Sequence, residues 1–154
     1  MTIQSIVGIP PAAVHDTQRE GIRLGLILGT VTWLWVAIID AIAGQPFHTF
    51  AVLGGIPAFT VVHYLLNIVF GITLIAVVHG AERVPSLMIG MVFVLLTFEG
   101  GVAMLTNLIA ESPVGPEAWT AIFGGNVLSL AIAGFLISRK HPLGLYLRRA
   151  ETEV

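Results

Sequence analysis

Four long apolar segments dominate this sequence and restrict what the chain can fold into. They cover approximately residues 21–43, 57–79, 85–109 and 116–138. About 20 mostly apolar residues are needed for one helix to cross the hydrocarbon core of a bilayer, so each segment is long enough to span a membrane once. A single segment in lipid satisfies its own backbone polar groups only as a helix. The sequence therefore predicts an all-α fold, an integral membrane four-helix bundle.

The composition favours a surface that faces lipid rather than water. Of the 154 residues, 56% are hydrophobic and only 10% are charged, whereas soluble domains carry about 25% charged residues. The net charge of −2 provides no basic field that would hold nucleic acid. The absence of cysteine excludes disulfides, thiolate metal sites and cysteine nucleophiles. The expected partner is the lipid bilayer, and nucleic acid is not expected.

Prolines and polar flanks set the expected domain organisation. Pro57, Pro85 and Pro116 stand where three of the helices are expected to begin, because proline suits the first helical position. The stretch before the first apolar segment lacks the pattern of a cleaved signal peptide. We expect a cytoplasmic N-terminal segment at 1–20, a four-helix domain at 21–138 and a cytoplasmic tail at 139–154.

The basic residues predict the orientation of the helices. All seven Lys and Arg fall on one side of the membrane under this helix assignment, and the two loops at about 44–56 and 110–115 contain none. Cytoplasmic loops carry the excess of Lys and Arg, so both termini are expected in the cytoplasm. The seven residues are Arg19, Arg23, Arg83, Arg139, Lys140, Arg148 and Arg149.

Small residues recur at four-residue spacing in two of the predicted helices. Such spacing places them on one helix face, where a neighbouring backbone can approach closely. This face packs either inside one four-helix bundle or against another subunit, and both alternatives remain open. The residues are Gly21, Gly25 and Gly29 in the first helix and Gly125, Ser129 and Ala133 in the fourth.

Four polar residues within the spans form the candidate functional site. His63 lies roughly 9 Å below the outer end of its helix, and Asn67 lies one turn deeper on the same face. Glu99 lies near the middle of the third span, and Asn126 lies at a depth similar to that of Asn67. Ionisable groups are costly in a membrane. The alternatives are a hydrogen-bonded network that fixes helix register, a proton, metal or cofactor site, or no convergence of these residues at all.

Histidine placement limits the possible metal sites. His48, in the outer loop, is a candidate to fold over His63, so His48, His63 and Glu99 are candidate metal ligands. His79 lies roughly 24 Å along the helix from His63, so the two cannot bind one group. The remaining polar residues at the membrane edge are interpreted as solvated or carry no special signal: His15, His79, Glu82, Arg83 and His141.

One set of residues carries a resemblance to known proteins. The segment 40–47, His63, Glu99 and the closing Arg-Lys-His-Pro at 139–142 together resemble small four-helix inner-membrane proteins of bacteria whose function is unknown. The resemblance implies a bacterial origin and the four-helix fold. It implies neither an activity nor a cofactor.

No motif indicates catalysis. The sequence has no H-E-x-x-H, no G-x-S-x-G and no phosphate-binding glycine loop. We therefore expect a non-catalytic accessory or structural subunit that packs against a larger membrane complex or self-associates, and that requires no cofactor. By analogy alone, an energy-converting complex is a suitable host. The alternatives are an intramembrane metal- or cofactor-binding protein and a small proton-linked transporter that acts as an oligomer.

Overall fold

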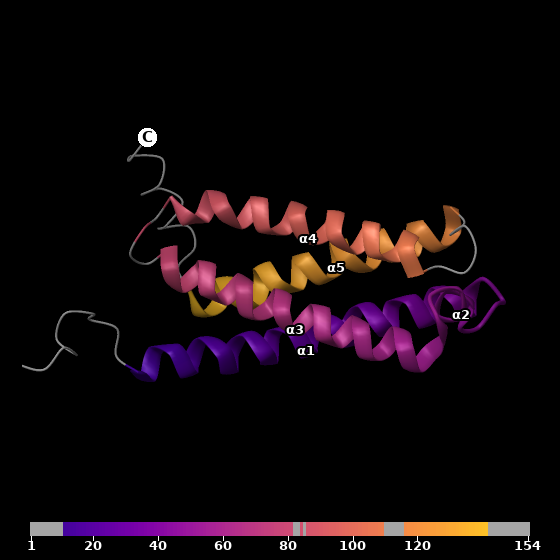
Figure 1. Ribbon diagram of the computed structural model, residues 1–154, viewed down its shortest axis with the longest axis horizontal. Helices are drawn as coiled ribbons and strands as arrows, with labels where there is room; N and C mark the ends of the chain where they lie inside the picture. The colour runs from indigo at the N-terminus through magenta and orange to yellow at the C-terminus, as the bar shows by residue number, and fades with distance from the viewer. Residues whose placement is uncertain (1–10, 82–83, 85, 110–115, 142–154) are drawn as a thin grey trace, which may run out of the picture.

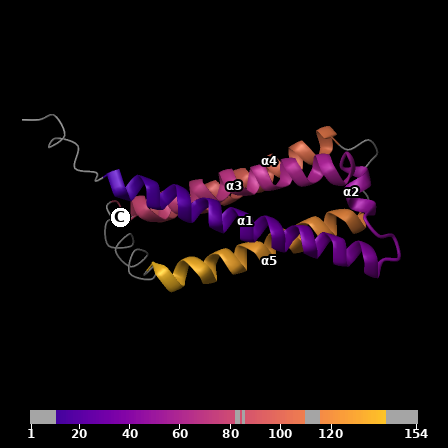
Figure 2. The ribbon, with the colours of Figure 1, turned by 90° about the horizontal axis from the view of Figure 1, so that it is seen from below.

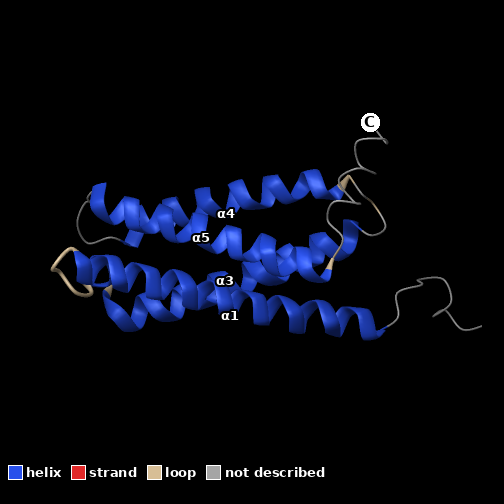
Figure 3. Cartoon of the chain, turned by 180° about the vertical axis from the view of Figure 1, so that it is seen from behind, coloured by secondary structure: helices blue, strands red, loops and turns tan. Residues whose placement is uncertain are grey.

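Five helices make up the described part of the chain. The computed structural model describes the backbone of residues 11–81, 84, 86–109 and 116–141, and none of these residues forms a strand (Figure 3). The four long helices lie along one common direction, with the short helix at one end (Figure 1). The helices are α1 (Pro11–Ile42), α2 (His48–Val52), α3 (Gly55–Ala81), α4 (Leu87–Ile109) and α5 (Pro116–Lys140).

Three of the helices are long and apolar enough to cross a membrane. These stretches are Asp16–Ile42, Gly55–Ala81 and Ala118–Lys140, with mean hydropathies of 1.9, 2.3 and 1.9. Large apolar side chains cover their outer surfaces, such as Val61, which is 69% exposed. An apolar surface of this extent is costly in water but is the expected outer surface in lipid. The chain is therefore an integral membrane protein, and the prediction of an all-helical fold is confirmed.

The helix boundaries differ from the predicted ones at several ends. Helix α1 begins at Pro11, well before the apolar stretch that starts at Gly21. Polar residues also form helices, so a helix can begin before the apolar run does. Helix α3 begins at Gly55 rather than Pro57, and α4 begins at Leu87. Helix α5 begins at Pro116 as predicted. The short α2 was not expected, because nothing in its five residues signals a helix on its own.

The glycine face of α1 lies against α3, where the two backbones touch. A Cβ atom added at Gly21 would overlap the backbone of Ile72, and one at Gly25 would overlap the carbonyl group of Asn67. Gly71 on α3 is equally close to the backbone of α1. Gly29 continues the same face and lies against the ring of Tyr64. In lipid, where apolar helices gain no hydrophobic free energy by associating, such close backbone packing supplies much of the attraction between helices.

Helix α5 packs against α1, and α4 packs against α3, so that the four long helices form one bundle (Figure 2). At Gly125, a Cβ atom would lie 3.0 Å from the Thr32 side chain and 3.1 Å from that of Trp35. The Trp35 indole N–H donates to the backbone oxygen of Ala121 at 3.0 Å. Ala133 is buried in the core that α1, α3 and α5 share. The contact of α4 includes stacking of Phe98 on Phe70, with ring centroids 4.2 Å apart.

Candidate functional site

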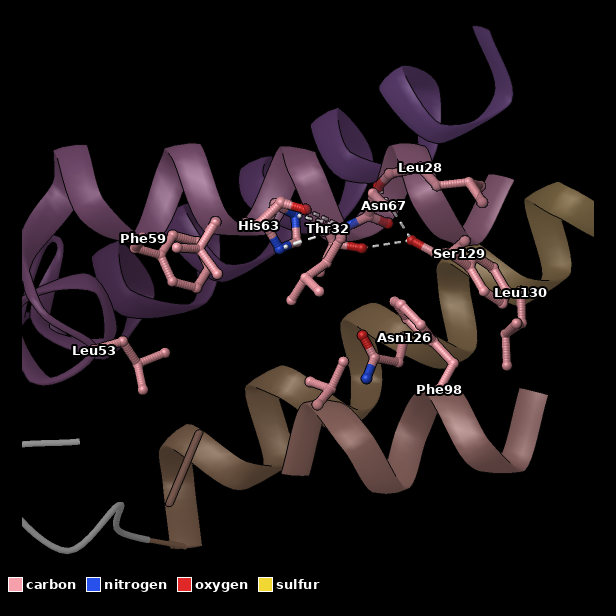
Figure 4. Close-up of a pocket in the computed structure, with 14 residues that line it drawn as sticks. Leu28, Thr32, Leu53, Phe59, His63, Asn67, Phe98, Asn126, Ser129 and Leu130 are labelled. Atoms are coloured by element: carbon pink, nitrogen blue, oxygen red, sulfur yellow. Dashed lines mark hydrogen bonds between the residues drawn. The ribbon is translucent and has the colours of Figure 1, made fainter. Parts of the chain in front are cut away.

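A cavity lies between α1, α3, α4 and α5, and it collects most of the polar residues within the bundle. Its volume is about 80 Å³. Thr32, His63, Asn67, Asn126 and Ser129 are its polar lining residues (Figure 4). The other described residues that line it are apolar: Leu28, Leu53, Phe59, Val62, Leu66, Phe70, Phe98, Val102 and Leu130. Three of the four candidate residues predicted from the sequence thus share one cavity.

His63 is held by the neighbouring helix and by an aromatic ring. Its Nε2 atom lies 3.0 Å from the Gly29 carbonyl oxygen on α1. Because a carbonyl only accepts, Nε2 carries the proton and donates. The ring also stacks on Phe59, with an interplanar angle of 14° and centroids 5.1 Å apart. The His63 side chain therefore links α3 to α1 in a single orientation.

Asn67 lies one turn deeper than His63, as its four-residue spacing predicts. Its Nδ2 atom donates to the His63 backbone oxygen at 2.9 Å and lies 3.5 Å and 3.4 Å from the two ring nitrogens. The Asn67 side chain is buried. The Asn67 side-chain amide therefore donates its hydrogen bond within α3 and lies against the imidazole ring of His63.

A second pair of polar side chains joins α1 to α5. The hydroxyl oxygens of Thr32 and Ser129 are 2.6 Å apart, and both residues are buried. The Ser129 hydroxyl also lies 3.4 Å from the Leu28 carbonyl oxygen. Thr32 carried no signal in the sequence analysis, because a lone threonine in an apolar helix is common and its partner is 97 residues away.

The geometry around the cavity is that of a hydrogen-bonded network. Pockets that bind cofactors and drug-sized ligands have volumes of about 300–1,000 Å³, whereas about 80 Å³ admits only a few waters or a small group. The polar groups of His63, Asn67, Thr32 and Ser129 bond to one another or to backbone. The side chain of Glu99 lies outside the described part of the structure, so its expected contact with His63 stays a prediction.

At the end of the bundle where α1 ends, the carboxylate of Asp40 binds the start of α2. One carboxylate oxygen accepts from the Thr49 backbone N–H at 2.8 Å, and the other accepts from the Thr49 hydroxyl at 2.7 Å. A buried carboxylate thus caps the start of the short helix. His48 begins that helix and is exposed.

At the opposite end of the bundle, polar side chains from three helices meet around Glu20. The carboxylate of Glu20 on α1 lies 3.7 Å from His79 Nε2 at the end of α3 and 3.6 Å from His141 Nε2, just past the end of α5. Lys140 Nζ donates to Glu20 Oε1 at 3.0 Å. Thr17 Oγ1 lies 2.7 Å from His79 Nδ1. In the described part of the chain, this is the one group of three His, Cys, Asp or Glu close enough to hold one ion, with ligand atoms within 4.8 Å of one another.

Sequence reasoning missed this cluster. It treated His79 as a solvated residue beside Glu82 and Arg83, which lie outside the described residues, and it gave no role to His141. The predicted topology contained a usable signal, since Glu20, His79 and His141 each stand at a helix end on the same side of the membrane. The three described residues that lie close enough to hold one ion include neither His48 nor His63. A metal site of His48, His63 and Glu99 stays a prediction, because the Glu99 side chain lies outside the described part of the structure.

Comparison of the chain with protein-family models, with curated proteins and with solved structures finds no match. Function is therefore inferred from the residues and their geometry.

Proposed function

We propose that this protein is a four-span, non-catalytic accessory subunit that packs against a larger membrane protein complex. The observation that carries the proposal is the contrast between two sets of glycines. Gly21, Gly25 and Gly71 lie in the contact between α1 and α3, where the two backbones leave no room for a side chain. The other set lies on α4 and α5, where no described residue comes within 4 Å of an added Cβ atom: Gly90, Gly100, Gly101 and Gly134.

Open glycines on a lipid-facing surface suit the close approach of another helix. Gly101 borders an apolar groove of about 420 Å³ on the outside of α3 and α4. Met104 and Leu108, 66% and 70% exposed, line the same groove. The occupant we propose is an apolar transmembrane helix of a partner subunit, since the groove runs beside a helix and offers it a side-chain-free approach at Gly101.

The four-span architecture rests on where the helix ends lie. The contacts of Glu20 with His79 and Lys140 bring the ends of α3 and α5 to the end of the bundle where α1 begins (Figure 1). Helix α4 must then carry the chain back along the bundle. Its 23 residues extend about 34 Å, enough for the roughly 30 Å hydrocarbon core. By this argument α4 is a fourth span.

The orientation and location follow from the charges at the same end. Arg19, Arg23, Arg139 and Lys140 belong to the end of the bundle where α1 begins and α5 ends, and the loop at 43–54 carries no Lys or Arg. We therefore place both termini in the cytoplasm. The resemblance to small bacterial inner-membrane proteins supports the bacterial cytoplasmic membrane as the location, and a host complex of the energy-converting class remains an analogy.

The alternative functions have less support from the geometry. A cofactor-binding protein or a proton-linked transporter would use the cavity beside His63. That cavity has a volume of about 80 Å³, and the hydrogen bonds of His63 and Asn67 go to neighbouring protein groups. A network of this kind fixes the orientation of helices and leaves little room for a ligand.

Gentle extraction from the native membrane tests the accessory function. We expect the wild-type protein to co-migrate with identified partner subunits in a fixed ratio, and Gly101→Leu to abolish this co-migration without changing the melting temperature of the isolated protein. Phe93→Leu is the matched control, because Phe93 also lies on α4 and is 73% exposed. A wild-type protein that migrates alone or only with copies of itself, or a Gly101→Leu variant that keeps its partners, would refute the proposal. A bound chromophore would favour the cofactor alternative.

A further inference from the structure

We propose that Glu20, His79 and His141 form a binding site for one Zn²⁺ ion at the end of the bundle where α1 begins. This inference does not rest on the accessory function. It concerns a cluster that brings the start of α1 together with the ends of α3 and α5 (Figure 1).

The distances between the three side chains are close to those of a zinc site. His79 Nε2 lies 3.7 Å from Glu20 Oε2, and His141 Nε2 lies 3.6 Å from Glu20 Oε1. Ligands of a tetrahedral zinc ion, bonded at about 2.0–2.2 Å, lie about 3.3–3.6 Å from one another. One ligand atom from each residue already lies within 4.8 Å of the other two. Side-chain movements of about 1 Å or less therefore suffice to place all three on one ion.

A hydrogen bond from outside the ligand set orients His79. Its Nδ1 atom lies 2.7 Å from the Thr17 hydroxyl oxygen, one turn before Glu20 on α1. With Nε2 bonded to zinc, Nδ1 carries the ring proton and donates a hydrogen bond to the Thr17 hydroxyl oxygen. Zinc-bound histidines almost always make such a bond through their other nitrogen, which fixes the ring's tautomer and direction.

The donor set favours a transition-metal ion over Mg²⁺ or Ca²⁺. Two imidazoles and one carboxylate match the ligands that zinc takes in proteins, whereas Mg²⁺ and Ca²⁺ prefer oxygen alone. The side chains are 21% exposed for Glu20, 26% for His79 and 12% for His141. Three protein ligands leave a fourth position for water, and this partial exposure allows water to reach it.

Lys140 is the feature that opposes metal binding, and it makes the inference testable in two directions. Its ammonium group lies 3.0 Å from Glu20 Oε1 and repels a nearby cation. The Lys140 side chain is 63% exposed, so it can move into solvent when the ion binds. If the cluster serves only as an ion pair that joins helix ends, removing Lys140 should not create affinity for zinc. If the cluster is a zinc site, removing Lys140 strengthens binding.

Calorimetric titration of Zn²⁺ alone into untagged, chelator-treated protein in nanodiscs tests the site. We expect one equivalent of saturable binding in the wild type. The variants His79→Ala, His141→Ala and Glu20→Gln should each bind at least tenfold more weakly, and Lys140→Gln should bind at least threefold more tightly. His48→Ala is the matched control, because His48 is exposed at the other end of the bundle; its affinity should equal that of the wild type.

Two further readouts keep the result decisive if a variant folds poorly. Zinc should raise the melting temperature of the wild type, because an ion that binds only the folded state stabilises it. Co²⁺ in place of Zn²⁺ should give visible absorption bands of a four-coordinate site in the wild type and in Lys140→Gln. The inference is wrong if the wild type shows no saturable zinc binding below 100 µM, if His79→Ala and His141→Ala bind as the wild type does, or if His48→Ala weakens binding equally.

Discussion

The hydroxyl oxygens of Thr32 and Ser129 lie 2.6 Å apart at the contact between α1 and α5. Both side chains are buried, so neither exchanges this bond for one to water. The bond lies on the rim of the cavity that also holds His63. It fixes the rotation of α5 about its own axis, because Ser129 faces Thr32 only in that orientation.

Removing this hydrogen bond should weaken the α1–α5 contact by a modest amount. Thr32→Val keeps the shape of the side chain, and Ser129→Ala removes the other hydroxyl. A double-mutant cycle on thermal or denaturant unfolding should give a coupling free energy of about 0.6 kcal/mol and no more than about 1.7 kcal/mol, the range for hydrogen bonds between membrane helices. A coupling indistinguishable from zero would show that the two hydroxyls do not depend on each other.

The contact of α1 with α3 should be far less tolerant. Gly25→Leu places a side chain where the Asn67 carbonyl lies, so the helices must separate. We expect the free energy of unfolding to fall by about 1–3 kcal/mol or more, as it does when a packed interior receives a larger side chain. Gly134→Leu is the control, since no residue that the structure describes lies within 4 Å of an added Cβ atom there. Equal melting temperatures for the two variants in detergent would refute this prediction.

The sequence predicted those structural features that a pattern within a single helix determines. Long apolar runs predicted the three helices that are long and apolar enough to cross a membrane, and four-residue spacing predicted that Asn67 would lie one turn from His63. The Thr32–Ser129 bond depends on how α5 rotates against α1, which no pattern within either helix determines. The Glu20–Lys140 contact likewise joins residues 120 positions apart. The hydrogen bonds at the start of α2 come from a carboxylate nine residues before Thr49.

The cap formed by Asp40 should be necessary for α2. Asp40→Ala removes both acceptors for Thr49, and loss of a cap of this kind costs about 0.5–2 kcal/mol. The effect should be local, because α2 is short and contacts chiefly α3 and α1. Hydrogen exchange should accelerate at the amides of residues 48–52 and stay unchanged in the centre of α3. Gln45→Ala, an exposed position in the same loop, should leave exchange in α2 unchanged; protection of α2 that survives Asp40→Ala would contradict the capping role.

Glu99 gives a prediction that separates structure from chemistry. We expect its side chain to face the bundle interior near His63, because a charged group at the centre of a span costs about 2.5–3.5 kcal/mol on insertion scales. If its role is structural, Glu99→Gln should keep the melting temperature, because an amide still donates and accepts. Glu99→Leu should lower it, because buried polar partners lose a hydrogen bond. Equal stability of the Gln and Leu variants would place Glu99 outside the network.

Topology is the prediction on which the orientation of both candidate sites depends. Alkaline phosphatase is active only after export, and green fluorescent protein exported in unfolded form does not fluoresce. Fusions after Arg83 and at the C-terminus should therefore fluoresce, while phosphatase fusions at Phe47 and Pro113 should be active. Helix α4 alone separates Arg83 from Pro113, so opposite results at these two positions would establish α4 as a membrane crossing. Equal results there would remove the fourth span, and an active phosphatase at the C-terminus would reverse the orientation, placing the Glu20 cluster outside.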